Sequence, residues 1–494
     1  MSMLRRLALI LSLGLFGVVL TMKSQAPPQS ASLPPALAAN LQKLRDEALA
    51  SDYAWLQAAH LTENIGPRLS GSPQAQQAVD YVASELRRLG LDVKLEKVMV
   101  PHWVRGEERA ELTIFPGQPP SVSDERTAGG QQAPTAQKIV LTALGNSSAT
   151  PADGLTADII VVNSFDELAA MGRDKVAGRI VLFNEKFDKH MAAAGHGLEA
   201  YETAVAYRGR GPLAAQQLGA SAALVRTVGG ADFRLPHTGN SARAGIPAAA
   251  VTAEDADLIA DLSKQGRVVM HLVLTPQTLP DEVSYNVIAD LRGREHPEQI
   301  VIASGHLDSW DLGTGAIDDA AGVAVAMQAA NLCEQLGLQP SRTLRVIAWM
   351  NEENGSRGST AYMADYKDSL PNHVAAIESD LGANHPLGFV GFWDPGALPV
   401  LKEIAATLAP IGANLVEATG ESGADIDPMA DAGVPVFSPM QDSRFYFNYH
   451  HSAADTLDKI DPRELAENAA VMAVLSYALA DMRQPLPRTP PSLK

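Results

Sequence analysis

The 494-residue chain contains one cysteine, Cys333. A single thiol cannot form an internal disulfide, and it gives no support for a zinc site built from thiolates. Cys333 stands in an apolar run of helical spacing over residues 320–336, so we expect it to be a buried core residue. The fold is therefore expected to do without a disulfide framework.

Positive charge is also scarce. The chain has 57 Asp and Glu residues against 39 Lys and Arg residues, which gives a formal net charge of −18. A surface this acidic repels phosphate groups. We therefore expect that neither nucleic acid nor an anionic membrane surface is a partner of this protein.

The N-terminal apolar run, residues 7–20, is short for a bilayer span. It follows two arginines and precedes Ser24-Gln25-Ala26, which offers small residues at a cleavage site. This arrangement predicts a signal peptide over residues 1–26 and export to the periplasm or the extracellular space, with no stable membrane insertion after cleavage. Pro27 is unfavourable directly after a cleavage site, so retention of the segment as an anchor is the alternative.

The length of the chain exceeds what one hydrophobic core usually serves, so we expect two domains. A polar stretch rich in Pro and Gly after Pro116 interrupts an α/β pattern that resumes near Ser284. We therefore predict a linker, a catalytic domain in two segments, an inserted domain and a Pro-rich tail. Their residues are 27–35, 36–116 with 279–484, 117–278 and 485–494, respectively.

Ionisable side chains follow four apolar runs that have the length and composition of buried strands. In open α/β sheets the functional residues lie just beyond the carboxyl ends of such strands. We therefore predict a doubly wound, mostly parallel sheet flanked by helices, with a metal site at one edge. The residues are His306, Asp308, Asp318 and Asp319 after 300–303, Glu352 and Glu353 after 343–350, Asp380 after 374–377, and His450 and His451 after 434–437.

Imidazoles and carboxylates without cysteine suit a catalytic zinc site, which keeps one position open for water. Asp308, two residues after His306, can accept the second ring N–H and fix the tautomer. Of the adjacent Glu352 and Glu353, one can bind metal while the other takes a proton from the attacking water. The set therefore predicts hydrolysis at a carbonyl.

Each part of this set also has a simpler explanation. Asp318 and Asp319 precede a predicted helix, and either of them could cap it. The glutamate pair alone would more often be a solvated turn, and the histidine pair an exposed loop. The joint occurrence of all these residues at four strand ends favours the metal site.

Five short segments carry a resemblance to a known family, namely GHLDSWD, GAIDDAAG, NEEN, ESD and HHSAADT, in this order. They are similar to the co-catalytic zinc exopeptidases, and most similar to the plasma glutamate carboxypeptidase (carboxypeptidase Q) group, over about residues 40–480. That group has a secretion signal and an inserted protease-associated domain. Residues 178–183, 215–226 and 245–250 resemble this β-rich domain, so the insert is expected to be one.

The resemblance implies two zinc ions and a role for each residue of the set. One zinc would be held by His306 and Asp380, the other by Glu353 and His451, and Asp318 would bridge them. Glu352 would be the general base, and Asp308 the partner of His306. Some relatives have a tyrosine directed at the oxyanion one position before the last ligand. Here that position is His450, whose ring N–H can do the same work.

These assignments predict a secreted metallo-exopeptidase, an aminopeptidase or dipeptidase that hydrolyses small peptides from a free end. A glutaminyl cyclase-like enzyme shares the fold but resembles a single-zinc site without the first histidine ligand, so His306 argues against it. A receptor-like relative without activity would have lost its ligands, and here the set is complete. The insert is expected to have no chemistry of its own and either to cover the cleft or to form a homodimer contact.

Overall fold

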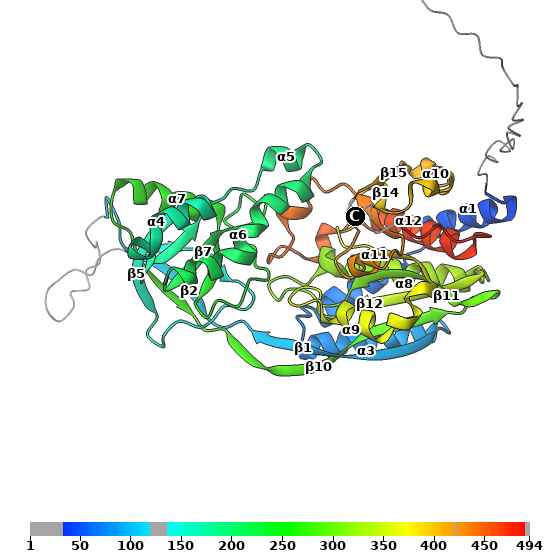
Figure 1. Ribbon diagram of the computed structural model, residues 1–494, viewed down its shortest axis with the longest axis horizontal. Helices are drawn as coiled ribbons and strands as arrows, with labels where there is room; N and C mark the ends of the chain where they lie inside the picture. The colour runs from blue at the N-terminus through cyan, green and yellow to red at the C-terminus, as the bar shows by residue number, and fades with distance from the viewer. Residues whose placement is uncertain (1–32, 119–135, 420–421, 490–494) are drawn as a thin grey trace, which may run out of the picture.

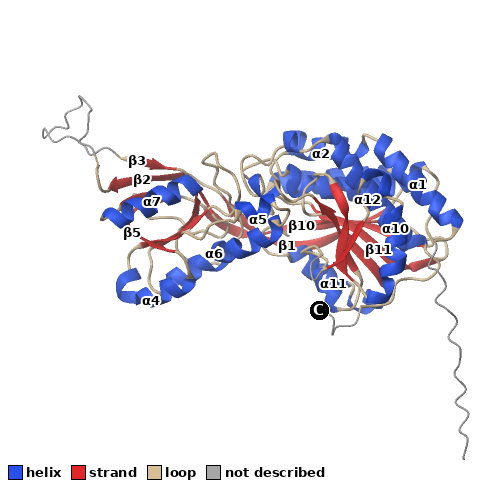
Figure 2. Ribbon diagram, turned by 90° about the horizontal axis from the view of Figure 1, so that it is seen from above, coloured by secondary structure: helices blue, strands red, loops and turns tan. Residues whose placement is uncertain are grey.

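The structure, a computed structural model, describes residues 33–118, 136–419 and 422–489. The predicted signal peptide and most of the predicted linker 27–35 lie outside these residues. In the part that is described, no helix has the length and apolar composition needed to cross a membrane. The chain forms two lobes along its long axis, each built on a sheet of eight strands (Figures 1 and 2).

The first sheet belongs to the catalytic lobe. Its four central strands, β12, β11, β13 and β16, are parallel. At one side β10 runs antiparallel to both β12 and β1, and at the other side β14 runs antiparallel to β16 but parallel to β15. The sheet is therefore mixed, with the predicted parallel arrangement at its centre. In spatial order the strands are β1 (Asp92–Val104), β10 (Gln277–Leu291), β12 (Arg342–Trp349), β11 (His296–His306), β13 (His373–Glu378), β16 (Val436–Gln441), β14 (Pro386–Phe392) and β15 (Leu415–Ala418).

Alternate residues of the central strands point to opposite faces of this sheet. Val301 and Ala303 of β11 belong to a large core, and Ile300 and Ile302 belong to a separate, smaller one. Helices thus cover both faces, which confirms the predicted doubly wound architecture. The large core includes residues of α1 (Pro35–Ala50), α2 (Tyr53–Ala59), α3 (Pro73–Arg88), α8 (Ala321–Gln335), α10 (Leu398–Ala406) and α12 (Pro462–Asp481), and the smaller core includes residues of α9 (Arg357–Asp365) and α11 (Asp427–Asp431). Cys333 is buried in the large core, as predicted.

The second lobe is the insert. Parallel strands form the middle of its sheet, and helices accompany them in the described residues, so the lobe is mixed α/β rather than mainly β. The strand order is β3 (Gln137–Ile139), β2 (Glu108–Ile114), β9 (Val269–Leu274), β5 (Leu155–Val162), β6 (Ile180–Phe183), β7 (Ala222–Arg226), β8 (Ala248–Val251) and β4 (Leu141–Ala143). The helices are α4 (Phe165–Val176), α5 (Lys189–Ala193), α6 (Gly197–Gln217) and α7 (Ala253–Gln265). Its relationship to the protease-associated domain stays a prediction.

The connection between the lobes differs from the predicted boundary. Strand β2, which we expected in the catalytic domain, pairs with β3 and β9 of the second sheet. The second sheet therefore begins at Glu108, ahead of the boundary predicted at residue 117. The long antiparallel pair of β1 and β10 carries the chain between the lobes (Figure 1). Strands β1 and β2 have similar local patterns, so the sequence does not tell which sheet each one joins.

The C-terminal segment packs onto the catalytic lobe as far as it is described. The N–H of Thr489 donates to the main-chain oxygen of Gly433 at 3.0 Å, and the guanidinium of Arg488 donates to that of His373 at 3.1 Å. Residues 485–489 of the predicted tail are therefore part of the folded lobe.

Candidate metal centre

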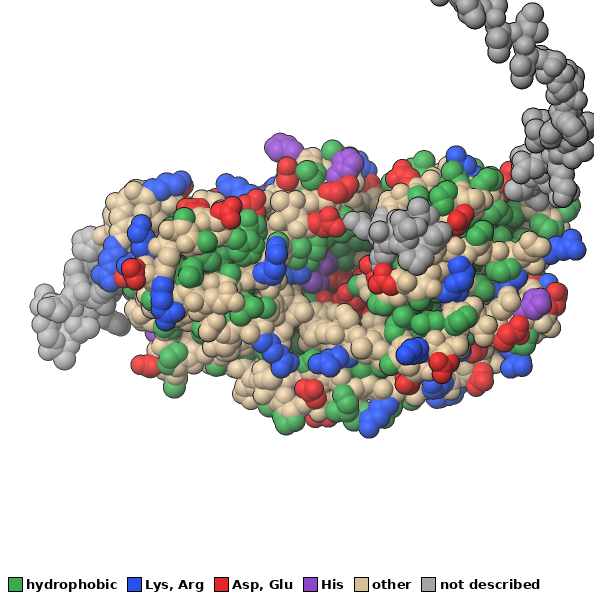
Figure 3. Space-filling model, viewed as in Figure 1, with side chains coloured by type: hydrophobic (Ala, Val, Ile, Leu, Met, Phe, Trp, Pro, Cys, Tyr) green, Lys and Arg blue, Asp and Glu red, His purple; other side chains and the backbone are tan. Residues whose placement is uncertain are grey.

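The carboxyl ends of the central strands bring the predicted ligands together. Strand β11 ends at His306, β12 is followed by Glu352 and Glu353, and β13 is followed by Asp380. Because these strands are parallel neighbours, their ends meet at one edge of the sheet. Asp318 precedes α8, and the loop after β16 adds His450 and His451. Figure 3 shows histidine and acidic side chains gathered in the hollow between the lobes.

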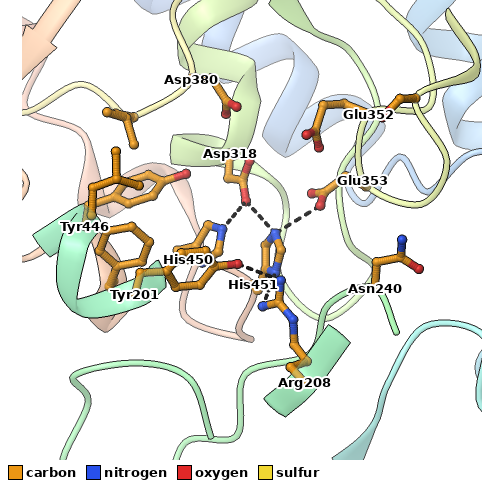
Figure 4. Close-up of a pocket in the computed structure, with 14 residues that line it drawn as sticks. Tyr201, Arg208, Asn240, Asp318, Glu352, Glu353, Asp380, Tyr446, His450 and His451 are labelled. Carbon is orange, nitrogen blue, oxygen red and sulfur yellow. Dashed lines mark hydrogen bonds and ion pairs between the residues drawn. The ribbon is translucent and has the colours of Figure 1, made fainter. Parts of the chain in front are cut away.

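Asp318 lies at the centre of this group (Figure 4). Its Oδ1 is 3.0 Å from Nε2 of His306, which is also 3.2 Å from Oδ1 of Asp380. Its Oδ2 is 3.2 Å from Nε2 of His451, which is also 3.0 Å from Oε2 of Glu353. The five residues thus form two half-sites, each with one imidazole and one carboxylate of its own, which share the carboxylate of Asp318.

Asp319 does not face the metal site as Asp318 does, and its carboxylate binds main-chain N–H groups instead. Its Oδ1 accepts the N–H of Gly322 at 2.8 Å, in the first turn of α8, and its Oδ2 accepts the N–H of His306 at 3.0 Å. A Cβ atom at Gly322 would lie 2.3 Å from this carboxylate, so only glycine permits the approach. Asp319 is therefore the helix cap, and Asp318 is the residue that faces the site.

The part played by Asp308 differs from the prediction. Nδ1 of His306 lies 2.9 Å from the main-chain oxygen of Asp308, not from its carboxylate. The carboxylate instead accepts the N–H groups of Asn351 and Glu352, at 2.7 and 3.1 Å, and the hydroxyl of Ser70 at 2.9 Å. A main-chain carbonyl can accept the ring N–H of a histidine and fix its tautomer as well as a carboxylate can. The carboxylate of Asp308 is therefore available to bind the N–H groups of the turn after β12.

The histidine pair faces the site from the other side. The two rings are stacked, with centroids 3.6 Å apart, and Nε2 of His450 lies 3.4 Å from Oδ2 of Asp318. Of these two histidines, only His451 also contacts Glu353 in the part of the chain that is described. Burial lowers the pKa of His451 to about 4 and that of His450 well below its usual range, so both rings are neutral at pH 7. Neutral imidazoles can bind metal, and each can donate one N–H.

The electrostatics of the cluster fit bound cations. Burial, together with repulsion from neighbouring carboxylates, raises the pKa values of Glu352 and Glu353 well above their usual range. Burial also opposes ionisation of Asp318, but hydrogen bonds from His306 and His451 outweigh it and hold its pKa well below the usual range. Several acids buried at such short range stay ionised together only with positive charge between them. The nitrogen and oxygen donors are those that zinc accepts in catalytic sites.

Comparison with known proteins identifies the family of this site. The family model described as "Peptidase family M28" matches residues 286–476. Carboxypeptidase Q of Bos taurus and of Homo sapiens are each 36% identical to the chain over 446 residues, which cover 89% of this chain and 88% of each relative. The chain belongs to peptidase family M28. It is a metallo-exopeptidase of the carboxypeptidase Q-like group, as the sequence motifs predicted.

Two solved structures have the same fold. The crystal structure of a peptidase M28 precursor from Shewanella amazonensis SB2B superposes with a TM-score of 0.84 at 35% identity, over 92% of this chain and 99% of that one. BSAP, a zinc aminopeptidase from Bacillus subtilis, matches in fold with a TM-score of 0.61 at 19% identity, over 87% of this chain and 96% of that one. Membership of the family makes zinc the metal expected at the site.

The pocket over the M28 site is walled by both lobes. It encloses about 360 Å³, and the insert contributes Tyr201, Arg208 and Asn240 to its lining (Figure 4). Arg208 donates to the hydroxyl of Tyr201 at 2.6 Å, and its Nη1 lies 3.2 Å from Nδ1 of His451. The sequence had not singled out any of these three residues of the insert. No local pattern marks these residues, because Tyr201 and Arg208 of α6 and Asn240 of a loop reach the site only through the packing of the insert on the catalytic lobe.

Sequence reasoning also missed Arg68. Its side chain is fully buried and donates to five main-chain oxygens, which are those of Leu61, Gly66, Leu307, Thr314 and Gly315. Burial lowers the pKa of Arg68 to about 10, which leaves it charged at pH 7. Arg68 thereby ties the segment before α3 to the loop between His306 and Asp318. The available signal in the sequence was an arginine within a short turn-like segment, between Gly66-Pro67 and Leu69-Ser70-Gly71.

Proposed function

We propose that this protein is an exported exopeptidase that hydrolyses small peptides at a centre of two zinc ions, with Glu352 as the general base. The observation that carries this proposal is the position of Asp318 between two half-sites, each with its own imidazole and carboxylate. Five such donors exceed what one tetrahedral zinc takes.

The half-sites suggest which residues would hold each ion. His306 and Asp380 would bind one zinc, and Glu353 and His451 the other. The carboxylate of Asp318 would bridge them, since two dications close together repel each other unless an anion lies between them. Bound zinc would polarise the scissile carbonyl and make a nearby water more acidic.

The two adjacent glutamates have different surroundings. The carboxylate of Glu353 is engaged at both oxygens, because Oε1 accepts the N–H of Trp310 at 3.2 Å and Oε2 contacts His451. Glu352 lines the pocket, and no hydrogen bond to its carboxylate is found among the described residues. Its carboxylate is therefore available to accept a proton from water and to pass it to the leaving amine. We therefore assign Glu352 as the base.

His450 is proposed as the donor to the oxyanion. Its ring is held between the stacked ring of His451 and the edge of Tyr201, whose centroid lies 5.2 Å away at 90°. A neutral imidazole in this cage can present one N–H to the pocket without reorganisation, which is what stabilisation of a developing oxyanion requires.

The size of the pocket supports small substrates. A cavity of about 360 Å³, closed on one side by the insert, has room for a short peptide end but not for a folded chain. Cleavage from a free end is therefore proposed, and the insert is proposed to cover the cleft. Export rests on the signal peptide predicted at residues 1–26, and homodimerisation through the insert remains a proposal.

The alternative functions lose support at specific residues. A cyclase-like single-zinc site would lack the first histidine ligand, whereas His306 here contacts both Asp318 and Asp380. A receptor-like relative would lack ligands, whereas all five residues converge.

A set of matched dipeptides tests the proposed function. Each dipeptide is supplied with both ends free, with the amine acylated or with the carboxylate amidated. We expect rapid hydrolysis of the dipeptides with both ends free, which a chelator abolishes and added Zn²⁺ restores. Comparison with the acylated and the amidated dipeptides identifies which free end the enzyme needs. Undiminished hydrolysis after complete removal of metal would overturn the proposal.

A further inference from the structure

The insert binds the main chain of the loop that carries the histidine pair. Nδ1 of His237 lies 2.6 Å from the main-chain oxygen of His450, and the N–H of Thr238 donates to that of His451 at 2.8 Å. His237 and Ser452 form an antiparallel bridge. The insert is thus joined to the loop at the metal centre by an isolated β-bridge and by hydrogen bonds on either side of it.

The side chain of His237 is held firmly in the insert. The residue is fully buried, and its main-chain N–H donates to the side-chain hydroxyl of Thr227 at 2.8 Å. A carbonyl oxygen can only accept, so the proton of the neutral ring must lie on Nδ1. The other nitrogen, Nε2, has no hydrogen-bond partner among the residues that the structure describes. The bond to the oxygen of His450 is therefore what fixes the orientation of this ring.

Two adjacent glycines of the insert make room for the His237 ring and for the loop, respectively. A Cβ atom at Gly229 would lie 2.4 Å from Cε1 of His237, and one at Gly230 would lie 2.2 Å from Oδ1 of Asn448. The N–H of Gly230 also donates to the main-chain oxygen of Phe447 at 3.0 Å. The insert backbone is thus built to lie directly against residues 447–452.

The loop needs such support, because His451 has a φ of +60°. This left-handed conformation is sparsely populated by residues with a Cβ atom and persists only when the surroundings fix it. Here the carbonyl groups of His450 and His451 both accept hydrogen bonds from the insert. In this conformation the ring of His451 reaches Asp318 and Glu353.

We propose that His237 is a positioning residue of the metal centre, which holds the main chain at His450 so that the His451 imidazole completes the second zinc half-site. This rests on the proposed function, in which His451 is a ligand. The insert is then not only a cover for the cleft. It supplies the backbone pairing without which one half-site is loosely formed.

A pair of substitutions in the full-length protein tests this role. In His237→Asn the side-chain amide N–H takes the place of Nδ1–H, whereas His237→Phe fills a similar volume without a donor. We expect His237→Phe to weaken the binding of one of the two zinc ions by about 10- to 100-fold, the usual effect of losing a residue that orients a ligand. His237→Asn should keep both affinities close to those of the wild type. Zinc is titrated against a competing chelator, and bound zinc is counted by elemental analysis.

His373→Phe is the matched control. His373 is also fully buried and has its Nδ1 3.1 Å from a main-chain oxygen, that of Ser369, but it lies at the opposite end of β13 from the metal centre. The His373→Phe variant should be less stable than the wild type but should bind both zinc ions with unchanged affinity. If His237→Phe does not fold, Gly229→Ala displaces the same ring without removing it and should weaken the same zinc.

The outcomes separate this inference from the proposed function. Two zinc ions in the wild type and one in His451→Ala would uphold the ligand assignment. Wild-type affinity for both ions in a folded His237→Phe or Gly229→Ala variant would then overturn the positioning role alone. A wild type that holds fewer than two zinc ions, or a His451→Ala variant that retains both, would instead refute the proposed function on which the inference rests.

Discussion

The main-chain oxygen of Asp308 lies 2.9 Å from Nδ1 of His306, while the carboxylate of the same aspartate holds the turn that begins at Asn351. One residue therefore orients the first proposed ligand with its backbone and the proposed general base, Glu352, with its side chain. Substitutions of the side chain should affect the second task and spare the first.

Asp308→Ala should lower kcat by about 10- to 100-fold while zinc content stays unchanged, since the N–H groups of Asn351 and Glu352 lose their acceptor but His306 keeps its own. Asp308→Asn should be much milder, because the amide oxygen can still accept both N–H groups. Kinetics and elemental analysis of the two variants check this. Loss of zinc from Asp308→Ala would show that the carboxylate orients His306 after all.

Glu352→Gln should keep the fold and both metals but lose at least about 10²-fold in kcat, because the amide retains the shape of the side chain and cannot accept a proton. Glu353→Gln should instead weaken zinc binding, since Glu353 contacts His451. Single-turnover kinetics on zinc-loaded protein separate the two effects. If the two variants exchanged these behaviours, the roles of the two glutamates would have to be exchanged as well.

Arg105→Met should lower the free energy of unfolding by about 1–3 kcal/mol, because it leaves two partly buried carboxylates without their hydrogen-bond donor. Arg105 binds both oxygens of Asp311 at 2.7 and 2.8 Å and Oε1 of Glu108 at 2.7 Å, so it joins the catalytic lobe to the second sheet. Urea unfolding measures the change. The exposed pair of Arg267 and Asp158 is the control, and Arg267→Met should change stability little. Equal effects of both substitutions would contradict a structural role for the Arg105 contacts.

His373 should make stability depend on pH. Burial lowers its pKa to about 4 from an ordinary value of 6.5, with Nδ1–H donating to Ser369 and Nε2 accepting the Tyr362 hydroxyl at 2.7 Å. Between these pH values the unfolded chain binds a proton that the folded protein does not. The contribution of this residue is therefore fully present above pH 6.5 and is lost as the pH falls to about 4.

The comparison with His373→Phe isolates this effect from other titrating groups. The stability difference between wild type and variant should be largest at pH 7 and should shrink as the pH falls from 6.5 to 4. Urea unfolding at several pH values measures it. A difference that stayed constant over this range would show that the ring is not kept neutral by the fold.

The sequence predicted the parts of the centre that follow from strand ends. A buried strand followed by an ionisable residue is a local pattern, and four such patterns converge whenever their strands are parallel neighbours. This is why His306 and Asp380, which are 74 residues apart in the sequence, could be placed in one site. The residue pattern alone allowed either Asp318 or Asp319 to cap α8, and only the family resemblance assigned Asp318 as the ligand. The local pattern could not decide, because the direction of each side chain depends on the backbone before α8.

The rest depended on contacts without a local signature. His237 and Arg208 reach the centre from another lobe, and neither follows a strand end of the predicted catalytic sheet. The sheet membership of β2 and the use of a backbone oxygen by His306 depend likewise on tertiary packing. Resemblance to a family assigns side chains to roles, but it does not say which atom of a residue is used or which lobe supports it.

The count of zinc ions in Asp318→Ala, beside the wild type, tests the central claim most directly. Asp318 contacts both half-sites, so elemental analysis should find two zinc ions per chain in the wild type and none retained by the variant, whereas Asp380→Ala should lose mainly one. A fully active wild type with a single zinc ion, or an Asp318→Ala variant that keeps both, would contradict a shared two-metal centre.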